Sequence, residues 1–418
     1  CVLPGAFDAK ELWTAVANGR CLLTKADPKQ DWGLTTPVSD AELATAVGGY
    51  VRGFDAVFDP HAHENASKFA SRASDLFRWV LFCVRRALCD ASIDPASKHA
   101  RGGLVLGNLS YPTREFAEFV IDVWSKGTST ADPRERFMSG LPALLAAETF
   151  GLELGGMALD AACASSLYAI KMACDRLHDG EADFMVAGGV NHADDLYLHL
   201  GFTALKALSP TGRSRPFHRD ADGLIPAHGA AVVVLKRLAD AVRHGDSIHG
   251  VIRGVGLSND GRSSGLLNPS SEGQVRAMRQ AYANSGVDPA DVAYVECHAT
   301  GTRVGDAVEL RSMKSVFEQG VAVGSLKSNL GHLITASGAA GLLKVLQGMA
   351  HGQWPATLHV DAPSAELDDG QLRVVRTLEP WTGPRRAAIN NFGFGGNNAH
   401  LIVEAYDGVE PRPQPRSS

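Results

Sequence analysis

The sequence predicts an α/β protein in which helices cover buried sheets. Short runs of consecutive apolar residues, the pattern of buried strands, alternate with segments whose apolar residues recur every three or four positions, the pattern of amphipathic helices. Hydrophobic residues make up 45% of the 418-residue chain, enough for two ordinary domains or one large two-lobed domain. Such alternation favours sheets that are covered by helices.

Apart from the stretch 157–170, the first half of the chain contains three expected helices and three expected strands. One amphipathic helix is predicted over 8–18, and a longer one runs from around Phe54–Phe58 to Asp90, with a buried stripe that includes Leu76 and Leu88. A third helix is predicted over 141–149. Apolar runs predict strands at 104–107, 184–189 and 231–235.

A second series of strands and helices begins at Ile252. Ser271-Glu-Gly-Gln has the pattern of a capping box, so a helix is expected to follow it. A strand is predicted at 292–295, and helices are expected from Asp306 and from Ser337. These patterns divide the chain into an N-terminal half (1–240), a C-terminal half (241–408) and a proline-rich, linker-like tail (409–418).

The bulk composition argues against several classes of protein. The net charge is -6 and no cluster of Lys and Arg could follow phosphates, so a nucleic-acid surface is not expected. Seven cysteines without framework spacing or a CxxC pair indicate reduced thiols in a cytoplasmic protein, rather than disulfides or zinc. No uncharged apolar run reaches the roughly 20 residues of a membrane span. The chain starts at Cys1 without a methionine, so we expect it to be cut from something longer.

The stretch 157–170 reads as a buried strand that runs into a helix, with Cys163 at the joint. Small residues around Cys163 leave space for its sulfur, and a helix N-terminus would favour the thiolate over the thiol. A free cysteine is more often a small buried hydrophobic residue, so this stretch alone leaves both interpretations open.

Three later blocks are rich in glycine and, like that stretch, place polar residues among apolar ones: 296–306, 324–332 and 390–400. His298 follows the predicted strand at 292–295, and His332 follows Asn-Leu-Gly in a second turn. Either histidine alone would more often be a satisfied hydrogen-bonding residue. Two histidines and an elbow cysteine on separate glycine-rich loops instead indicate a catalytic constellation, because loops at strand ends commonly carry catalytic groups.

With these four blocks in this order and spacing, nearly the whole chain resembles the β-ketoacyl synthases, the condensing enzymes of fatty-acid and polyketide assembly. The resemblance implies a thiolase-like five-layered αβαβα sandwich made of two similar halves. It also implies the ketosynthase domain of a type I polyketide synthase, which joins a cysteine-bound acyl chain to a malonyl-type unit by decarboxylative Claisen condensation.

That reaction needs a nucleophile that is also a good leaving group, which Cys163 would supply. His298 and His332 would donate N–H groups to the enolate oxygen that forms when the extender loses carbon dioxide. By resemblance, the oxyanion of the acyl group would lie between the N–H groups of Cys163 and Phe394. Cys163, His298 and His332 are therefore the predicted catalytic residues.

Further roles are carried over from the family. Lys327 would lie in the site and pair with Glu309, and together they would tune the histidines. Phe394 would also gate the acyl pocket. The predicted substrate-binding residues are Thr300, Thr302, Asn329 and Gly395.

The resemblance also implies the partners. Substrates would arrive on the phosphopantetheine of an acyl carrier protein, and no metal or redox cofactor would be needed. Neighbouring synthase domains are expected, and so is a homodimer with the strand 184–190 near its two-fold axis. A thiolase-like acyltransferase, a non-elongating ketosynthase and a non-catalytic member of a heterodimer remain alternatives. A thiolase-like acyltransferase usually lacks the two-histidine pattern. A non-elongating ketosynthase usually lacks the equivalent of His298, and a non-catalytic member of a heterodimer usually lacks the nucleophile.

The sequence departs from the commonest modular synthases. Its segments 59–65, 107–112 and 191–195 are more similar to iterative synthases of polyunsaturated fatty acids and glycolipids. His228 replaces a usual glutamate, so it must either take over that support or loosen the loop. In the family an apolar strand precedes the segment that resembles Cys1-Val-Leu-Pro-Gly, so one sheet could be short of a strand.

Overall fold

The computed structural model describes residues 1–29, 31–33, 43–62, 67–192, 195–262, 265 and 268–408. The predicted tail 409–418 lies outside the described residues, as do parts of the segments 59–65 and 191–195. Among the described residues, no helix is long and apolar enough to cross a membrane.

The first of the two main sheets has four strands, in the order β4-β3-β5-β6. The three strands β4, β3 and β5 are parallel, and β6 pairs with β5 in the antiparallel direction. Every residue of β3 and β5 is buried, which explains their continuous apolar runs. Their bounds are β3 (Gly102–Asn108), β4 (Gly156–Leu159), β5 (Phe184–Asn191) and β6 (Gly229–Leu235).

The second main sheet has six strands, in the order β11-β9-β8-β13-β14-β7. The first four are parallel, β14 pairs with β13 in the antiparallel direction, and β7 pairs with β14 in the antiparallel direction and so runs the same way as the first four. Their bounds are β7 (Val251–Asn259), β8 (Tyr294–Glu296), β9 (Val321–Gly324), β11 (Leu372–Val374), β13 (Arg386–Phe392) and β14 (Asn397–Glu404).

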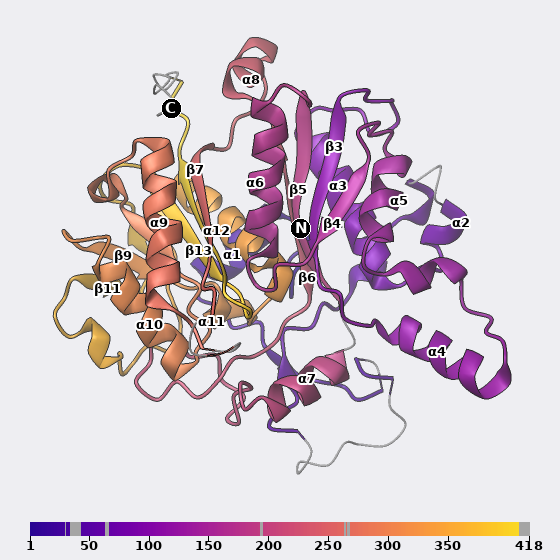
Figure 1. Ribbon diagram of the computed structural model, residues 1–418, viewed down its shortest axis with the longest axis horizontal. Helices are drawn as coiled ribbons and strands as arrows, with labels where there is room; N and C mark the ends of the chain where they lie inside the picture. The colour runs from indigo at the N-terminus through magenta and orange to yellow at the C-terminus, as the bar shows by residue number, and fades with distance from the viewer. Residues whose placement is uncertain are drawn as a thin grey trace.

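Helices cover both faces of each sheet, so the molecule has five layers (Figure 1). α6 (Ser165–His178) and α12 (Ser337–His351) lie between the sheets and contact both of them. α3 (Asp75–Asp90) and α5 (Leu141–Thr149) cover the outer face of the four-stranded sheet. α9 (Ser271–Ser285) and α10 (Arg303–Lys314) lie on the outer side of the six-stranded sheet. The expected αβαβα sandwich is confirmed.

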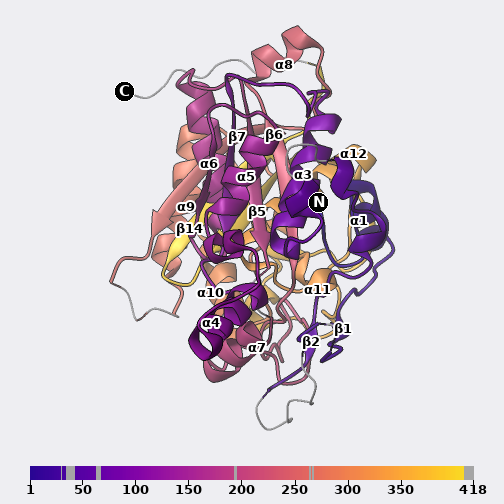
Figure 2. The same ribbon diagram turned by 90° about the vertical axis from the view of Figure 1, so that its right-hand side faces the viewer.

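The remaining elements lie around this sandwich (Figure 2). α1 packs against α12, whereas α4 has no buried residue. These elements are α1 (Ala9–Ala17), α2 (Ser67–Ala70), α4 (Arg114–Lys126), α7 (Asp195–Ala204), α8 (Leu238–His244), α11 (Lys327–Leu330), β1 (Thr24–Lys25), β2 (Val47–Gly48), β10 (Gln353–Trp354) and β12 (Glu379–Pro380).

The two halves repeat the same turn before their central helices. Ala162 and Ile334 adopt positive φ values of 50° and 43°. Each of them lies two residues before the N-cap of α6 or α12, and the two N-caps have nearly identical dihedral angles (φ -86°, ψ -6° and φ -90°, ψ -7°). Residues other than glycine rarely adopt such positive φ angles. The same unusual turn before both central helices therefore supports two similar halves, independently of the layer order.

Several sequence-based expectations need correction. The strand before Cys163 is not buried: β4 is the edge strand of its sheet, and Met157 on it is 39% exposed. Ser270, rather than Ser271, caps α9, because its hydroxyl accepts the N–H of Gly273. The helix expected from Asp306 begins at Arg303. The long helix expected from around Phe54–Phe58 to Asp90 is wrong at its start: short 3-10 turns lie at 54–56 and 60–62, and the α-helix with the buried stripe is α3, which begins at Asp75.

Candidate active site

Cys163 lies in a tight turn between β4 and α6. Ser165, the first residue of α6, closes this turn: its Oγ accepts the N–H of Ala161 at 2.8 Å and donates to the carbonyl of Ala162 at 2.6 Å. The cysteine is 6% exposed and packs with Leu198 and Ile334. The turn therefore presents the thiol to a small apolar space.

His332 contacts the thiol directly, with 3.0 Å between Nε2 and Cys163 Sγ. The backbone N–H of Ile334 donates to Nδ1 of His332 at 3.3 Å, so Nδ1 carries no proton. A neutral imidazole has one N–H, and we therefore assign the proton to Nε2. His332 thus points an N–H donor at the sulfur.

His298 follows β8 and brings a second imidazole to the same place. The rings of His298 and His332 are 5.3 Å apart and nearly perpendicular. One ligand atom of Cys163 and one from each histidine all lie within 4.8 Å of one another. Nδ1 of His298 is buried and has no hydrogen-bond partner among the described residues. The three residues that the sequence predicted as catalytic are therefore adjacent.

Burial keeps the cluster uncharged. It raises the pKa of Cys163 to about 11, although the charge of Lys327 and the N–H groups of Phe394 and Cys163 act in the opposite direction. Burial lowers the pKa of both His298 and His332 well below 6.5, and the charge of Lys327 adds to this effect. Desolvation therefore outweighs the helix terminus, which was expected to favour the thiolate.

The glycine-rich turn after β13 closes over the cysteine. A Cβ atom on Gly393 would lie 2.8 Å from the carbonyl oxygen of Ala161 and 3.2 Å from the nitrogen of Cys163, so only glycine fits there. Asn391 donates to the carbonyl of Cys163 at 2.6 Å and holds the nucleophile's backbone in place. This close approach brings the N–H groups of Phe394 and Cys163 to the sulfur.

Comparison with protein families decides the identity of this site. The model of the β-ketoacyl synthase N-terminal domain matches residues 1–241, and the model of the C-terminal domain matches 249–361. The ketoacyl-synthetase C-terminal extension matches 362–418. The chain belongs to the β-ketoacyl synthase family.

The relatives of this β-ketoacyl synthase are polyketide synthases. A phenolphthiocerol/phthiocerol polyketide synthase of Mycobacterium tuberculosis is 36% identical over 99% of the chain and 23% of its own length. Pikromycin polyketide synthase component PikAIII of Streptomyces venezuelae is 34% identical over 99% of the chain and 28% of its own length. The chain thus spans about a quarter of these relatives, and the predicted link to polyketide synthases is confirmed.

Solved structures agree with the fold. The PfaC keto synthase-chain length factor has a TM-score of 0.91 and 34% identity, and the match covers 99% of this chain and 48% of that one. The ketosynthase from module 6 of the bacillaene synthase of Bacillus subtilis 168 has a TM-score of 0.86 and 29% identity, over 98% of this chain and 71% of that one.

Lys327 lies in the site of the synthase, but it does not pair with Glu309 as predicted. The carboxylate of Glu309 instead accepts the backbone N–H groups of His298 and Ala299, at 2.8 and 2.7 Å, and the side-chain amide of Asn390 at 2.9 Å. These three donors occupy the carboxylate. Burial lowers the pKa of Lys327, whereas the charges of Glu296 and Glu309 raise it.

The two predicted substrate-binding threonines lie together, with 3.0 Å between the hydroxyls of Thr300 and Thr302. Their turn is held by Asp306, whose carboxylate accepts the N–H groups of Thr300, Gly301 and Phe217. Burial raises the pKa of Asp306 to about 7.

The other two predicted substrate contacts are placed differently. Asn329 is fully buried, and its amide donates to the carbonyl of Arg20 at 3.0 Å, so its side chain secures the N-terminal segment. Gly395 adopts a φ of 85° in the turn that carries Phe394, and its carbonyl accepts the amide of Asn259. Phe394 lies 6.3 Å from the ring of Phe202, next to the apolar space around the cysteine.

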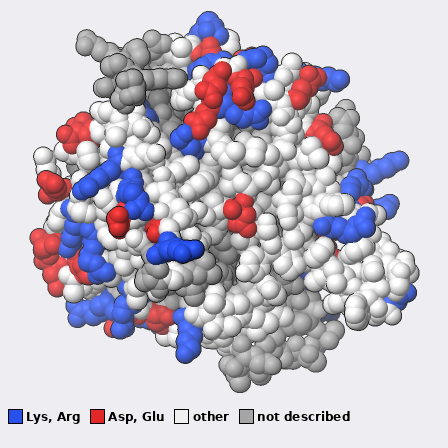
Figure 3. Space-filling view, viewed as in Figure 1, with Lys and Arg blue, Asp and Glu red and all other residues white. Residues whose placement is uncertain are grey.

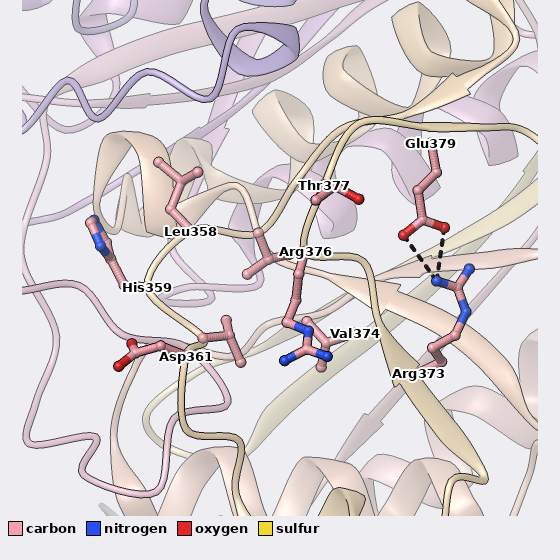
Figure 4. Close-up of a pocket in the computed structure, with 10 residues that line it drawn as sticks. Leu358, His359, Asp361, Arg373, Val374, Arg376, Thr377 and Glu379 are labelled. Carbon is pink, nitrogen blue, oxygen red and sulfur yellow. Dashed lines mark hydrogen bonds and ion pairs between the residues drawn. The ribbon is translucent and has the colours of Figure 1, made fainter.

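Two open cavities lie away from the sulfur. One, of about 630 Å³, is lined by residues 357–361, Arg373, Arg376 and Glu379 (Figure 4). The other, of about 480 Å³, includes Lys25, Arg213 and Ser214, and His359 lines both cavities. Ser214 donates to the carbonyl of Lys327 at 2.7 Å, which links the second cavity to the catalytic turn.

His228, the departure from the usual glutamate, is buried and held by its neighbours. Its ring stacks on His192 at 5.2 Å and meets the edge of Tyr50 at 5.8 Å. Its backbone N–H donates to Gly49 at 2.8 Å. The loop is therefore supported by ring packing rather than loosened.

Sequence reasoning missed Asn391 and the supporting role of Asp306. Both lie inside the glycine-rich blocks, so the blocks were the available signal. Asn391 bonds Cys163 and Asp306 bonds Phe217, and both of these partners are distant in sequence and could not be identified from spacing.

Proposed function

We propose that this β-ketoacyl synthase carries out decarboxylative Claisen condensation, with Cys163 as the acyl carrier and His298 and His332 as enolate stabilisers. The observation that carries this proposal is the contact of an N–H-bearing imidazole with the thiol, 3.0 Å apart, beside a second neutral imidazole. Neutral imidazoles suit N–H donation to a developing oxyanion.

In the first half-reaction, the sulfur of Cys163 attacks the carbonyl carbon of an acyl thioester. The Cys163 S–H proton passes to the departing thiol, and the new thioester bond replaces the old one. The tetrahedral oxyanion would accept the N–H groups of Cys163 and Phe394, as backbone oxyanion holes do. The raised pKa of Cys163 means that proton removal accompanies attack.

In the second half-reaction, a malonyl-type thioester loses its carboxylate as carbon dioxide. The electron pair of the broken C–C bond forms an enolate, whose oxygen would accept the N–H groups of His298 and His332. The enolate carbon then attacks the Cys163 thioester, a new C–C bond forms, and the cysteine leaves as a thiolate that takes up a proton. Lys327 stabilises negative charge in the site.

We assign no metal to this reaction, because the donor set suits hydrogen bonding. The N–H of Ile334 keeps the proton of His332 on the nitrogen that faces the sulfur, and a metal ligand atom must be unprotonated. Lys327 adds a positive charge beside the cluster.

The extender would arrive on the phosphopantetheine of an acyl carrier protein. The hydroxyls of Thr300 and Thr302 could hydrogen-bond the arm, and the nearby cavity with Lys25 and Arg213 could accept its phosphate. On the face in Figure 3, the described acidic and basic side chains are intermixed around the rim rather than drawn out in one basic stripe. That mixture is a poor match for a nucleic-acid backbone.

Neighbouring synthase domains and a homodimer complete the proposal. β5, which was expected near the two-fold axis, has β3 on one side and β6 on the other, so neither of its edges is free to pair with a second copy. β4 is the half-exposed edge and is the better candidate. Light scattering at micromolar concentration should give a dimer, and a monomer would contradict this part of the proposal.

For the finer sub-family, the two kinds of relative point in different directions. The PfaC structure has the higher TM-score of the two described, which favours the iterative polyunsaturated-fatty-acid group. The curated relatives, in contrast, are a phenolphthiocerol/phthiocerol synthase and a pikromycin synthase.

The condensation is tested by incubating the protein with an acyl thioester and malonyl carrier protein. Release of carbon dioxide together with a β-ketoacyl carrier protein is expected. Acylation of Cys163 without extension would instead identify a non-elongating ketosynthase, and no acylation would favour a non-catalytic member of a heterodimer.

A further inference from the structure

Behind the reactive cluster lies a buried ion pair that the condensation does not use. Nζ of Lys344, on α12, is 2.6 Å from Oε2 of Glu296, the last residue of β8. Their side chains are 0% and 3% exposed. Lys344 also donates to the hydroxyl of Tyr294 at 3.0 Å, and that hydroxyl donates to Oε2 of Glu296 at 3.0 Å.

Such a pair is poorly explained by stability. Removing two charges from water costs free energy that their attraction seldom more than offsets, and apolar replacements of buried pairs are often neutral or stabilising. The fold nevertheless makes room for this one: a Cβ atom on Gly341 of α12 would lie only 3.1 Å from Cγ of Glu296. A role other than stability is therefore worth seeking.

The second carboxylate oxygen of Glu296 reaches the other catalytic turn. Oε1 accepts the backbone N–H of Leu326 at 2.6 Å, and Leu326 immediately precedes Lys327. Glu296 itself lies two residues before His298. One carboxylate thus joins the turn that carries His298 to the turn that carries Lys327. The charge of Glu296 also raises the pKa of Lys327, more than the charge of Glu309 does.

We propose that Glu296, oriented by Lys344 and Tyr294, is a positioning residue that fixes the His298 turn against the Lys327 turn for decarboxylation. This inference rests on the proposed function. Acyl transfer depends on the backbone around Cys163 and Phe394, which Glu296 does not contact. The two half-reactions should therefore respond differently when the carboxylate is lost.

Two double variants separate the hydrogen bond from the charge. Glu296→Leu with Lys344→Met removes both charges and leaves the N–H of Leu326 without an acceptor. Glu296→Gln with Lys344→Met also removes both charges but keeps an oxygen for that N–H. Lys314→Met, which breaks the pair with Asp369 on the outside of the molecule, is the control. We would measure acylation of Cys163 and the kcat and KM of carbon dioxide release from malonyl carrier protein.

The leucine variant should lose about 10²-fold in kcat for carbon dioxide release, the scale of a displacement of about 1 Å. Its KM and its acylation rate should match the parent, and the glutamine variant should keep most of the activity. Equal release by the leucine variant and the parent, equal loss in both half-reactions, or the same loss in the glutamine variant would each overturn the positioning role.

If the leucine variant does not fold, Tyr294→Phe takes its place, since it keeps the ion pair and removes only the hydroxyl that bonds Oε2 of Glu296 and Nζ of Lys344. Selective loss of carbon dioxide release supports the role, and no loss or a parallel loss overturns it. A parent protein that releases no carbon dioxide refutes the proposed function and the positioning role with it. A parent that releases carbon dioxide and a leucine variant that does so equally refute the positioning role alone.

Discussion

Replacing His298 by alanine should separate the two half-reactions of the synthase. The imidazole lies with its ring centre 5.3 Å from that of His332, whereas its backbone N–H is tied independently to Glu309 at 2.8 Å. The substitution therefore removes one donor to the enolate and leaves the turn held. Loss of one preorganised oxyanion donor costs about 2.7 to 4 kcal/mol, or about 10² to 10³ in kcat.

Acylation of Cys163 should continue in this variant, because its oxyanion is held by backbone N–H groups that the substitution does not touch. Intact-protein mass spectrometry measures acyl loading, and trapped carbon dioxide measures decarboxylation of malonyl carrier protein. His351→Ala, which removes an exposed histidine at the end of α12, is the control. A His298→Ala variant that releases carbon dioxide at the parental rate would refute the two-histidine enolate site.

Four further outcomes follow from the geometry. Because burial raises the pKa of Cys163 to about 11, the rate of its alkylation by iodoacetamide should increase with pH up to that value. Lys327→Met removes a positive charge that lowers this pKa, so it should move the curve of rate against pH to higher pH. A curve with its midpoint below pH 8 would contradict the raised pKa. The pKa values of His298 and His332 lie well below 6.5, so carbon dioxide release should show no acidic limb near pH 6.5. In the unfolded chain these two histidines take up protons as the pH falls through 6.5, whereas in the folded protein they stay neutral. Thermal stability should therefore fall as the pH drops through 6.5. An unchanged melting temperature would argue against neutral histidines. Gly393→Ala should slow both half-reactions, since its Cβ would lie 2.8 Å from the carbonyl oxygen of Ala161, and a variant with normal acylation would show that this turn does not form the oxyanion hole.

The sequence patterns predicted the alternation of strands and helices, and the family resemblance supplied the five-layer order and the three proposed catalytic residues. Apolar runs predict β3 and β5 because both strands are buried on two faces. Glycine-rich blocks predict the turns near Cys163, because glycine adopts the positive φ angles found there more easily than other residues. The resemblance to the β-ketoacyl synthases then points to Cys163, His298 and His332 as the proposed catalytic residues. The apolar runs and the glycine-rich blocks are local features, so they can be found from the sequence alone.

The rest depends on contacts between distant segments. Glu309 is occupied by the backbone of the His298 turn rather than by Lys327, and Asn329 is held by Arg20, more than three hundred positions earlier. The thiol stays protonated because burial outweighs the helix terminus, and the extent of burial follows from the whole fold. β4 has the composition of a buried strand, but among the described strands it pairs only with β3 and is therefore an edge strand. Its place in the sheet depends on strand pairing, which composition does not give.

Cys163 is proposed to hold the acyl chain while a second unit is decarboxylated and joined to it. Peptide mapping by mass spectrometry, after incubation with an acyl thioester and then with isotopically labelled malonyl carrier protein, follows both events on one sample. We expect an acyl adduct on Cys163 alone, which disappears as labelled carbon dioxide and a β-ketoacyl carrier protein appear, and no adduct in Cys163→Ala. An adduct on Cys297 or Cys174, or condensation that persists in Cys163→Ala, would contradict the assignment of Cys163.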